Sequence, residues 1–258
     1  GMRADRFSRI GGPPLYRRPW AASPMTPGRN AGSRVGHPSV VTARAVAKSG
    51  RVLYAFSHFY LPFYGHEPSD IFWRFDPFAW IAAFVYDVDE GMEAAGDVGA
   101  EVDRLEELRE YLGARILVDA EVDRLFDDAR RYYRFERGVL RGGATYTMDE
   151  LVAVARERSF DFRLMHRALS QRCVRDYRED LFTWFRSFEM LMEIEDDVSS
   201  VDVDAERGTF NILVLAERLS GDRGVRFING LRRETEAELR ERGCGFPDAV
   251  SVIMTRVL

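Results

Sequence analysis

One long stretch, residues 180–204, constrains the fold more than any other part of the sequence. When it is placed on a helix, large apolar side chains cover well over half of the circumference. They are Phe182, Trp184, Phe185, Phe188, Leu191, Met192, Ile194, Val198 and Val201. A helix with so wide an apolar surface is buried on most sides. The sequence therefore predicts a central helix that other elements surround.

Apolar spacing typical of amphipathic helices recurs through most of the chain after residue 70. The first of these helices has Asp76 as N-cap and Pro77 at its first position, and Gly91 ends it. Further helices are expected at 98–112, 119–137, 148–157, 160–178, 180–203, 210–219 and 225–242, with a last one opened by Pro247. The aromatic-rich residues 51–64 fit a strand or a helix, and we interpret them as a helix.

Strand signals are scarce, because "VVTARAV" at 40–46 is nearly the only alternating β-branched run. The chain of 258 residues is long enough for a sizeable core, and 46% of its residues are hydrophobic. We therefore predict an all-α fold, a single helical bundle in which most helices run antiparallel to their neighbours.

The net charge of −5 is divided unevenly along the chain. Residues 1–51 hold ten Lys and Arg against one acidic residue, whereas the other 207 residues hold 27 basic and 41 acidic ones. The acidic body argues against nucleic acid as the main ligand. We divide the chain into a basic Pro/Gly/Arg-rich extension, residues 1–50, and a helical domain, residues 51–258. The extension fits a poorly ordered arm or a segment that folds over an acidic site.

No apolar run reaches the length of about 18 residues that a membrane-spanning helix needs. The longest, "FAWIAAFVY" at 78–86, is half as long. The N-terminal residues lack the apolar core of a signal peptide. Two cysteines, Cys173 and Cys244, are too few for a disulfide framework. We expect a cytoplasmic protein without a membrane span.

Oxygen-bearing side chains follow one side of the predicted central helix. Glu193, Asp197, Ser200 and Asp204 lie at steps of four, three and four, which places them in one row, and Glu189 extends it. Like charges at this spacing repel, and buried carboxylates are costly without compensation. Oxygen ligands without His or Cys suit Mg²⁺, which usually keeps waters and shares phosphate oxygens. We interpret the row as one wall of a metal–phosphate site; the alternative is a solvated acidic face.

A second acidic cluster, "VYDVDEG", ends the apolar helix that begins near Asp76. It puts Asp87, Asp89 and Glu90 where the helix dipole disfavours anions. Three carboxylates at this end are expected to face a cation. The alternative is an acidic helix end that faces water.

Two acidic motifs about a hundred residues apart, each on an apolar helix of an all-α chain, resemble those of the class I isoprenoid synthases. In "DDVSSVDVD", the positions that match the family's second metal motif are Asp196, Ser200 and Asp204, with Asp in place of the usual Glu. Helix geometry favours Asp197 as the partner of Ser200, so both aspartates remain candidates. The first motif, "DVDEG", is shorter than the family's DDxxD pattern.

The segment "DAERGTFNIL", residues 204–213, is similar to a squalene/phytoene synthase segment, and this similarity places Arg207 near a diphosphate. The resemblance implies an isoprenoid synthase-type bundle with a central apolar cavity, Mg²⁺ as cofactor, an allylic prenyl diphosphate as substrate, and a homodimer as a common assembly. The substrate would lose its diphosphate and then undergo cyclisation or prenyl coupling. The alternative is a non-catalytic descendant that binds a prenyl lipid or a protein partner, which the short first motif favours.

The resemblance also assigns roles to individual side chains. The implied metal ligands are Asp87, Asp89, Glu90, Glu193, Asp196, Asp197, Ser200 and Asp204. The implied catalytic residues are Asp87, Asp197 and Arg207. A diphosphate needs cations besides the metal, and the candidates are Arg156, Arg163, Arg167, Arg172 and Arg207. A carbocation needs aromatic faces, for which we select Trp80, Phe84 and Phe188.

Overall fold

The computed structural model describes residues 41–71, 76–95, 100–114, 116, 118–142, 145–172 and 179–243. Within these ranges the elements are all helical and no strand is present, which confirms the all-α prediction. The α-helices are α2 (Ala43–Phe59), α4 (Asp76–Ala95), α5 (Ala100–Gly113), α6 (Ala120–Leu140), α7 (Met148–Ala155), α8 (Phe160–Arg172), α9 (Glu179–Arg207), α10 (Ile212–Ser220) and α11 (Asp222–Gly243). Two short 3₁₀ helices, η1 (Leu61–Tyr64) and η2 (Pro68–Asp70), follow α2.

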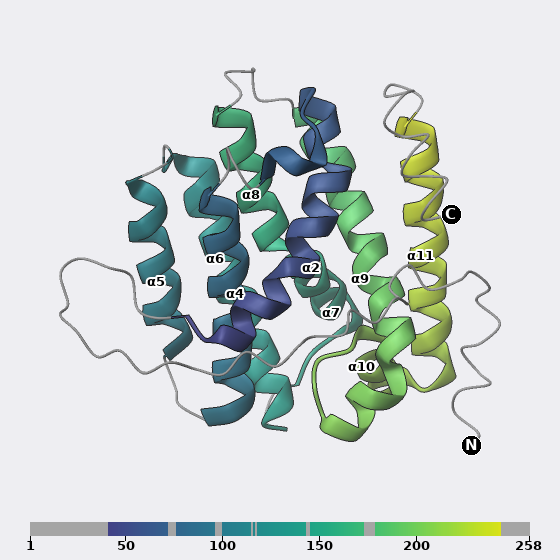
Figure 1. Ribbon diagram of the computed structural model, residues 1–258. Coiled ribbons are helices and arrows are strands. Elements are labelled where there is room, and N and C mark those ends of the chain that lie inside the picture. The colour runs from purple at the N-terminus through teal and green to yellow at the C-terminus, as the bar shows by residue number, and fades with distance from the viewer. Residues whose placement is uncertain are drawn as a thin grey trace.

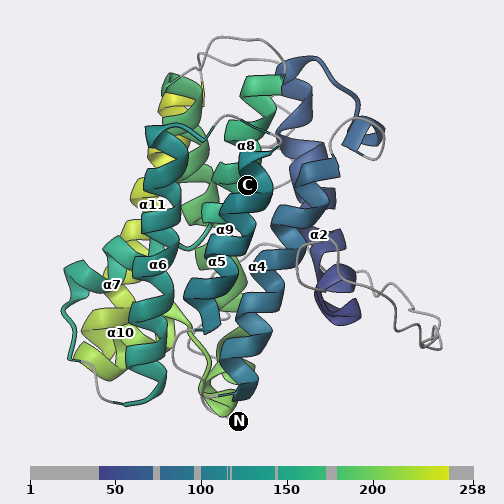
Figure 2. The ribbon, with the colours of Figure 1, turned by 90° about the vertical axis from the view of Figure 1, so that its left-hand side faces the viewer.

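The long helices stand side by side, with α5 at one edge of the bundle, α11 at the other, and the short α10 across the foot (Figure 1). Seen from the side, α2 and α4 lie together, while α7 and α10 form the opposite lower corner (Figure 2). Helices α9 and α11 run in opposite directions. Near the start of α9, Trp184 Nε1 donates to the Leu239 carbonyl (3.2 Å), and farther along Arg232 pairs with Glu195.

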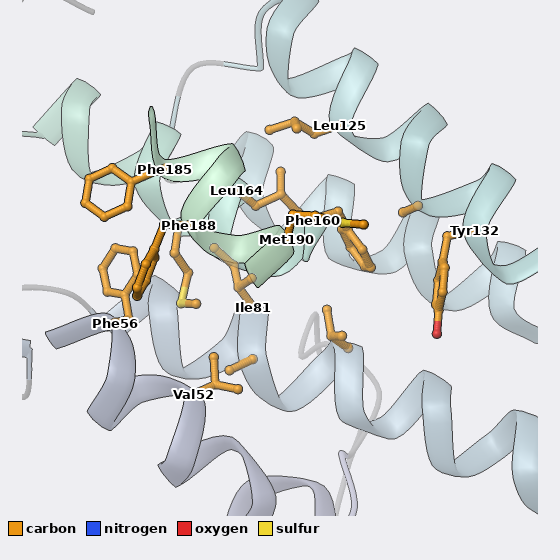
Figure 3. Close-up of a cluster of buried hydrophobic side chains, with 14 of the residues drawn as sticks. Val52, Phe56, Ile81, Leu125, Tyr132, Phe160, Leu164, Phe185, Phe188 and Met190 are labelled. Carbon is orange, nitrogen blue, oxygen red and sulfur yellow. The ribbon is translucent and has the colours of Figure 1, made fainter. Parts of the chain in front are cut away.

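The wide apolar surface of α9 is buried, as its sequence predicts. Trp184, Phe185 and Phe188 are each at most 3% exposed. Side chains from α2, α4, α6 and α8 converge on this surface (Figure 3). Because several neighbouring helices cover this surface of α9, a polar group that lies on the buried surface is either paired inside the protein or faces a cavity.

A tight reversal joins α9 to α10. Gly208 has φ of +71°, a conformation that glycine adopts without the steric penalty of a side chain. Its N–H and that of Thr209 both donate to the Asp204 carbonyl (2.8 and 3.1 Å). After the reversal, the side chain of Asn211 caps α10 by accepting from the N–H groups of Leu213 and Val214. The chain is thereby folded back against the last turn of α9.

Helix α2 begins at Ala43, so most of the "VVTARAV" run lies in a helix rather than a strand. Its N-cap Thr42 accepts a hydrogen bond from the Ala45 N–H (3.0 Å). Residues 51–64 are helical, as interpreted, first in α2 and then in η1. Residues 1–40 of the predicted extension and the helix expected from Pro247 lie outside the described residues. No helix in the described part of the chain has the length and apolarity that a membrane span requires.

Candidate functional site

A cavity of about 440 Å³ lies between α2, α4, α6, α9 and the segment that joins α7 to α8. Its lining on α9 runs from Phe188 to Arg207, or about 28 Å of helix. Phe188 is buried, whereas Arg51 and Arg207, which also line the cavity, are exposed. The cavity therefore has a closed end near Phe188 and a mouth near Arg207.

Aromatic side chains form the closed end. The rings of Phe59 and Phe188 meet edge to face with centroids 5.2 Å apart, and those of Tyr60 and Phe162 lie 5.8 Å apart. All four residues line the cavity. Phe188 thus has the environment predicted for it, an apolar chamber with ring faces and edges.

Six carboxylates besides Glu189 line the cavity. Asp89 comes from α4, Glu136 from α6, Asp161 from α8, and Glu193, Asp196 and Asp204 from α9. The prediction included all of these except Glu136 and Asp161. Facing helices therefore contribute acidic groups to one chamber, which is the arrangement that the two acidic motifs indicated.

The carboxylates are close enough to alter the protonation of their neighbours. The pKa of Asp161 is raised to about 8. Burial is the main cause, and the charges of Glu193 and Asp89 add to it, while the hydrogen bond from the Phe162 N–H opposes it. Burial also raises the pKa of Tyr86 well above its usual value, helped by Asp161 and Asp89. The chamber is a site of strong negative potential, in which a bound cation would be favoured.

The motif on α9 presents Asp196, Ser200 and Asp204 to the cavity. Asp204 is held in place by donors on both sides of the α9–α10 turn. Ser200 Oγ donates to Asp204 Oδ2 (2.5 Å), as does Asn211 Nδ2 (3.0 Å), while Thr209 Oγ1 donates to Oδ1 (2.9 Å). This side chain is therefore fixed before any ligand arrives.

Asp197, the other candidate in the motif, is only 1% exposed and does not line the cavity. Its Oδ1 accepts from Arg158 Nη1 and its Oδ2 from the Ile212 N–H, both at 2.7 Å. Burial raises its pKa to about 6, although both donors oppose that effect. The structure thus brings Asp196 into line with Ser200 and Asp204, and it uses Asp197 to join α9 to α10 and to Arg158.

The acidic end of α4 divides in the same way. Asp89 lines the cavity and accepts a hydrogen bond from the buried Tyr133 hydroxyl (2.9 Å). Asp87 instead accepts from the Thr42 N–H (2.9 Å) and pairs with Arg104. It therefore anchors the start of α2 and the helix α5. The side chain of Glu90 lies outside the described residues.

Of the arginines predicted to meet a diphosphate, Arg207 lies at the mouth. Arg163 is buried in an ion pair with Glu189 (2.9 Å), Arg167 pairs with Asp119, and Arg156 is exposed at the end of α7. None of these three lines the cavity. The side chain of Arg172 lies outside the described residues.

Sequence reasoning missed two arginines that do line the cavity, Arg51 on α2 and Arg158 between α7 and α8. Arg158 Nε lies 3.1 Å from Glu193 Oε2, and its guanidinium stacks over the Phe210 ring at 5.2 Å. The break between two predicted helices at 157–160 was the available signal, because residues at such breaks often carry function.

Trp80 and Phe84 do not line the cavity. Their rings pack against Tyr111 of α5 at 5.6 and 6.4 Å. Arg104 lies over the Phe84 ring at 4.9 Å. These two aromatic residues stabilise the α4–α5 contact instead of facing a ligand.

The donor set of the cavity fits a hard cation, because it offers carboxylate and hydroxyl oxygens in a region of excess negative charge. No group of three or more His, Cys, Asp or Glu side chains is arranged as a complete metal site in the ranges that the structure describes. Mg²⁺ usually takes one or two carboxylates and completes its shell with waters and phosphate oxygens.

No protein-family model, curated protein or solved structure matches the chain.

Proposed function

We propose that the protein is a Mg²⁺-dependent class I isoprenoid synthase that acts on an allylic prenyl diphosphate. The observation that carries the proposal is the two-part cavity. Carboxylates from α4 and α9 line its outer part, and an aromatic chamber closes its inner end. A prenyl diphosphate has the matching division, an anionic head that binds metal and an apolar tail.

Mg²⁺ would take one or two carboxylate ligands from among Asp89, Asp196 and Asp204, with Ser200 and Glu193 within the same wall. Bound Mg²⁺ would supply Lewis-acid stabilisation of the leaving diphosphate. The sequence resemblance assigns the same task to the α9 motif, and in this arrangement Asp196 rather than Asp197 performs it.

Arginines would bind the diphosphate oxygens that the metal leaves free. Arg51 and Arg207 stand at the mouth, and Arg158 lies farther in. Arg158 is held by Glu193 and Asp197, which fixes its guanidinium beside the carboxylates. Arg51 and Arg158 thus join the predicted Arg207 as diphosphate-binding candidates, in place of Arg156, Arg163 and Arg167.

The aromatic end would receive the prenyl chain. Phe59, Phe162 and Phe188 would shield this end from bulk water and present π faces to the allylic cation that forms when diphosphate leaves. Cyclisation or coupling to a second prenyl unit would follow. We further propose a cytoplasmic location, as expected from the small number of cysteines, and a homodimer, as implied by the sequence resemblance.

The test is calorimetric titration of inorganic pyrophosphate into the protein with and without Mg²⁺. We expect binding that requires Mg²⁺, and a loss of at least about 100-fold in Asp196→Ala, because a direct ligand contributes more than an outer-sphere residue. Asp202→Ala is the matched control, since Asp202 is exposed on the same helix and does not line the cavity. Equal binding without Mg²⁺, or none in either condition, would refute the proposal.

A second candidate function is a non-catalytic binder of prenyl lipids, and two contacts favour it. Arg158 already occupies Glu193 and Asp197, and Asp87 is closed off by Arg104. Incubation with geranyl, farnesyl and geranylgeranyl diphosphate separates the two candidates. Release of diphosphate above the rate in buffer supports the enzyme, whereas tight binding without release supports the binder.

A further inference from the structure

A buried polar cluster sits at the aromatic end of the cavity, where a site for hydrocarbon alone would need none. Glu189 of α9 is 3% exposed and lines the cavity. Its Oε1 accepts from the Tyr60 hydroxyl (2.6 Å) and its Oε2 from Arg163 Nε (2.9 Å). Tyr60, at the C-terminal end of α2, also lines the cavity.

The pairing with Arg163 does not account for the whole cluster. A structural ion pair would be satisfied without a tyrosine hydroxyl and without contact with the cavity. A carboxylate has about four lone-pair positions, so Glu189 keeps acceptor capacity beyond these two hydrogen bonds. A polar group of this kind inside a roomy cavity is a suitable anchor for a water molecule.

The position of Glu189 separates it from the carboxylates assigned to the metal. It precedes Asp196 by seven residues, or about 10 Å along α9. It is surrounded by Phe188 and Tyr60, where the prenyl chain and its cation would lie, and not by the groups at the mouth. A base at this depth would act on the chain and not on the diphosphate.

We propose that Glu189 and Tyr60 hold a water molecule at the aromatic end of the cavity and that Glu189 is the base when this water captures the carbocation. The water oxygen forms the C–O bond, one of its O–H bonds breaks, and the proton passes to a Glu189 carboxylate oxygen. The diphosphate has by then left with the bonding electron pair. The product class is therefore a prenyl or terpenoid alcohol.

This inference rests on the proposed function and deepens it. Burial raises the pKa of Glu189, although Arg163 and the Tyr60 hydroxyl oppose the effect, and a raised pKa makes the carboxylate a better proton acceptor. Burial, with the negative charge of Glu189, also raises the pKa of Tyr60 well above its usual value, so the phenol remains a donor.

To test this, the wild-type protein is incubated with Mg²⁺ and each of the three prenyl diphosphates in water labelled with a heavy oxygen isotope, and the products are analysed. We expect an alcohol that carries solvent oxygen at an internal carbon of the chain. In Glu189→Gln, diphosphate release should persist while the ratio of alcohol to olefin falls at least about 100-fold, the lower end of the range for a lost general base. Tyr60→Phe should lower the same ratio and leaves the Arg163–Glu189 pair intact, which guards against a folding defect in the first variant.

Glu195→Gln is the matched control on α9, because Glu195 pairs with Arg232 and does not line the cavity. Diphosphate release with olefin as the wild-type product, or an unchanged ratio in both variants, would overturn this inference and leave the proposed function standing. Absence of diphosphate release from every substrate would overturn both.

Discussion

The acidic segments of α9 and α4 can be compared residue by residue. On α9, Asp196 faces the cavity, while its neighbour Asp197 is buried against Arg158 and α10. On α4, Asp89 faces the cavity, while Asp87 holds the start of α2. Each segment thus divides its carboxylates between a chemical task and a structural one, and the number of acidic residues overstates the number of available ligands.

The two segments differ in how firmly the cavity-facing groups are held. Asp204 receives three side-chain hydrogen bonds from its own helix and from the turn that follows it. Asp89 receives one from Tyr133 of another helix. Under the proposed function, α9 would therefore be the principal metal-binding wall, and α4 would contribute a less firmly held carboxylate.

Asp161 lies between the two segments, so its titration reports on both. Its pKa of about 8 in the folded protein exceeds the value of 3.8 expected when unfolded. Folding stability is therefore greatest below pH 4 as far as this group is concerned, and it is lost as pH rises towards 8, by several kcal/mol in all. We expect the Tm of the wild type, measured without Mg²⁺, to fall relative to Asp161→Asn between pH 5 and pH 8. Parallel curves for the two proteins would show that the pKa of Asp161 is not raised by its burial and its neighbouring carboxylates.

Asp197→Asn should lower the free energy of unfolding by about 3 kcal/mol, because it removes one of the negative charges that compensate the partly buried Arg158. Denaturant titration monitored by circular dichroism measures the effect. The adjacent variant Asp196→Asn should leave the free energy of unfolding nearly unchanged, since its carboxylate faces the cavity. Similar losses in both variants would mean that the division on α9 is incorrect.

The same comparison applies to α4. Asp87→Asn should lower the free energy of unfolding by about 2 kcal/mol, because a charged partner of Arg104 and the Thr42 N–H is weakened. It should change Mg²⁺-dependent pyrophosphate affinity by no more than about twofold, a difference of about 0.4 kcal/mol. Asp89→Asn is the reciprocal variant, and a larger affinity loss from Asp87→Asn than from Asp89→Asn would reverse our assignment.

The smallest expected effect is that of Tyr133→Phe. It removes the hydrogen bond that orients Asp89 and should weaken Mg²⁺-dependent pyrophosphate binding about fivefold, corresponding to about 1 kcal/mol. Calorimetry on Tyr133→Phe, Asp89→Asn and the double variant gives the coupling. Additive losses would show that the tyrosine does not act through Asp89.

Helical periodicity made the fold predictable, because each long helix has one apolar stripe and recognisable end signals. The sequence resemblance matched Asp196, Ser200 and Asp204 to a metal motif, and all three line the cavity. Helix spacing instead favoured Asp197, which is buried against Arg158 and α10. Which of Asp87 and Asp89 faces the cavity could not be predicted, because it depends on how α4 is rotated against α2. Arg158 and Asp161 were missed for a related reason. They reach the cavity only because the chain breaks between α7 and α8, and the geometry of that break is set by tertiary packing.

The turn at Gly208 has a consequence for how long the site persists. Thr209 and Asn211, beyond the turn, hold Asp204, and Asn211 also caps the start of α10. If the last turn of α9 frays, Asp204 loses these donors in the same event that exposes the backbone of α10. The preformed site therefore persists only until this local opening occurs. Amide hydrogen exchange at Leu213 and Val214 would measure how often the opening occurs.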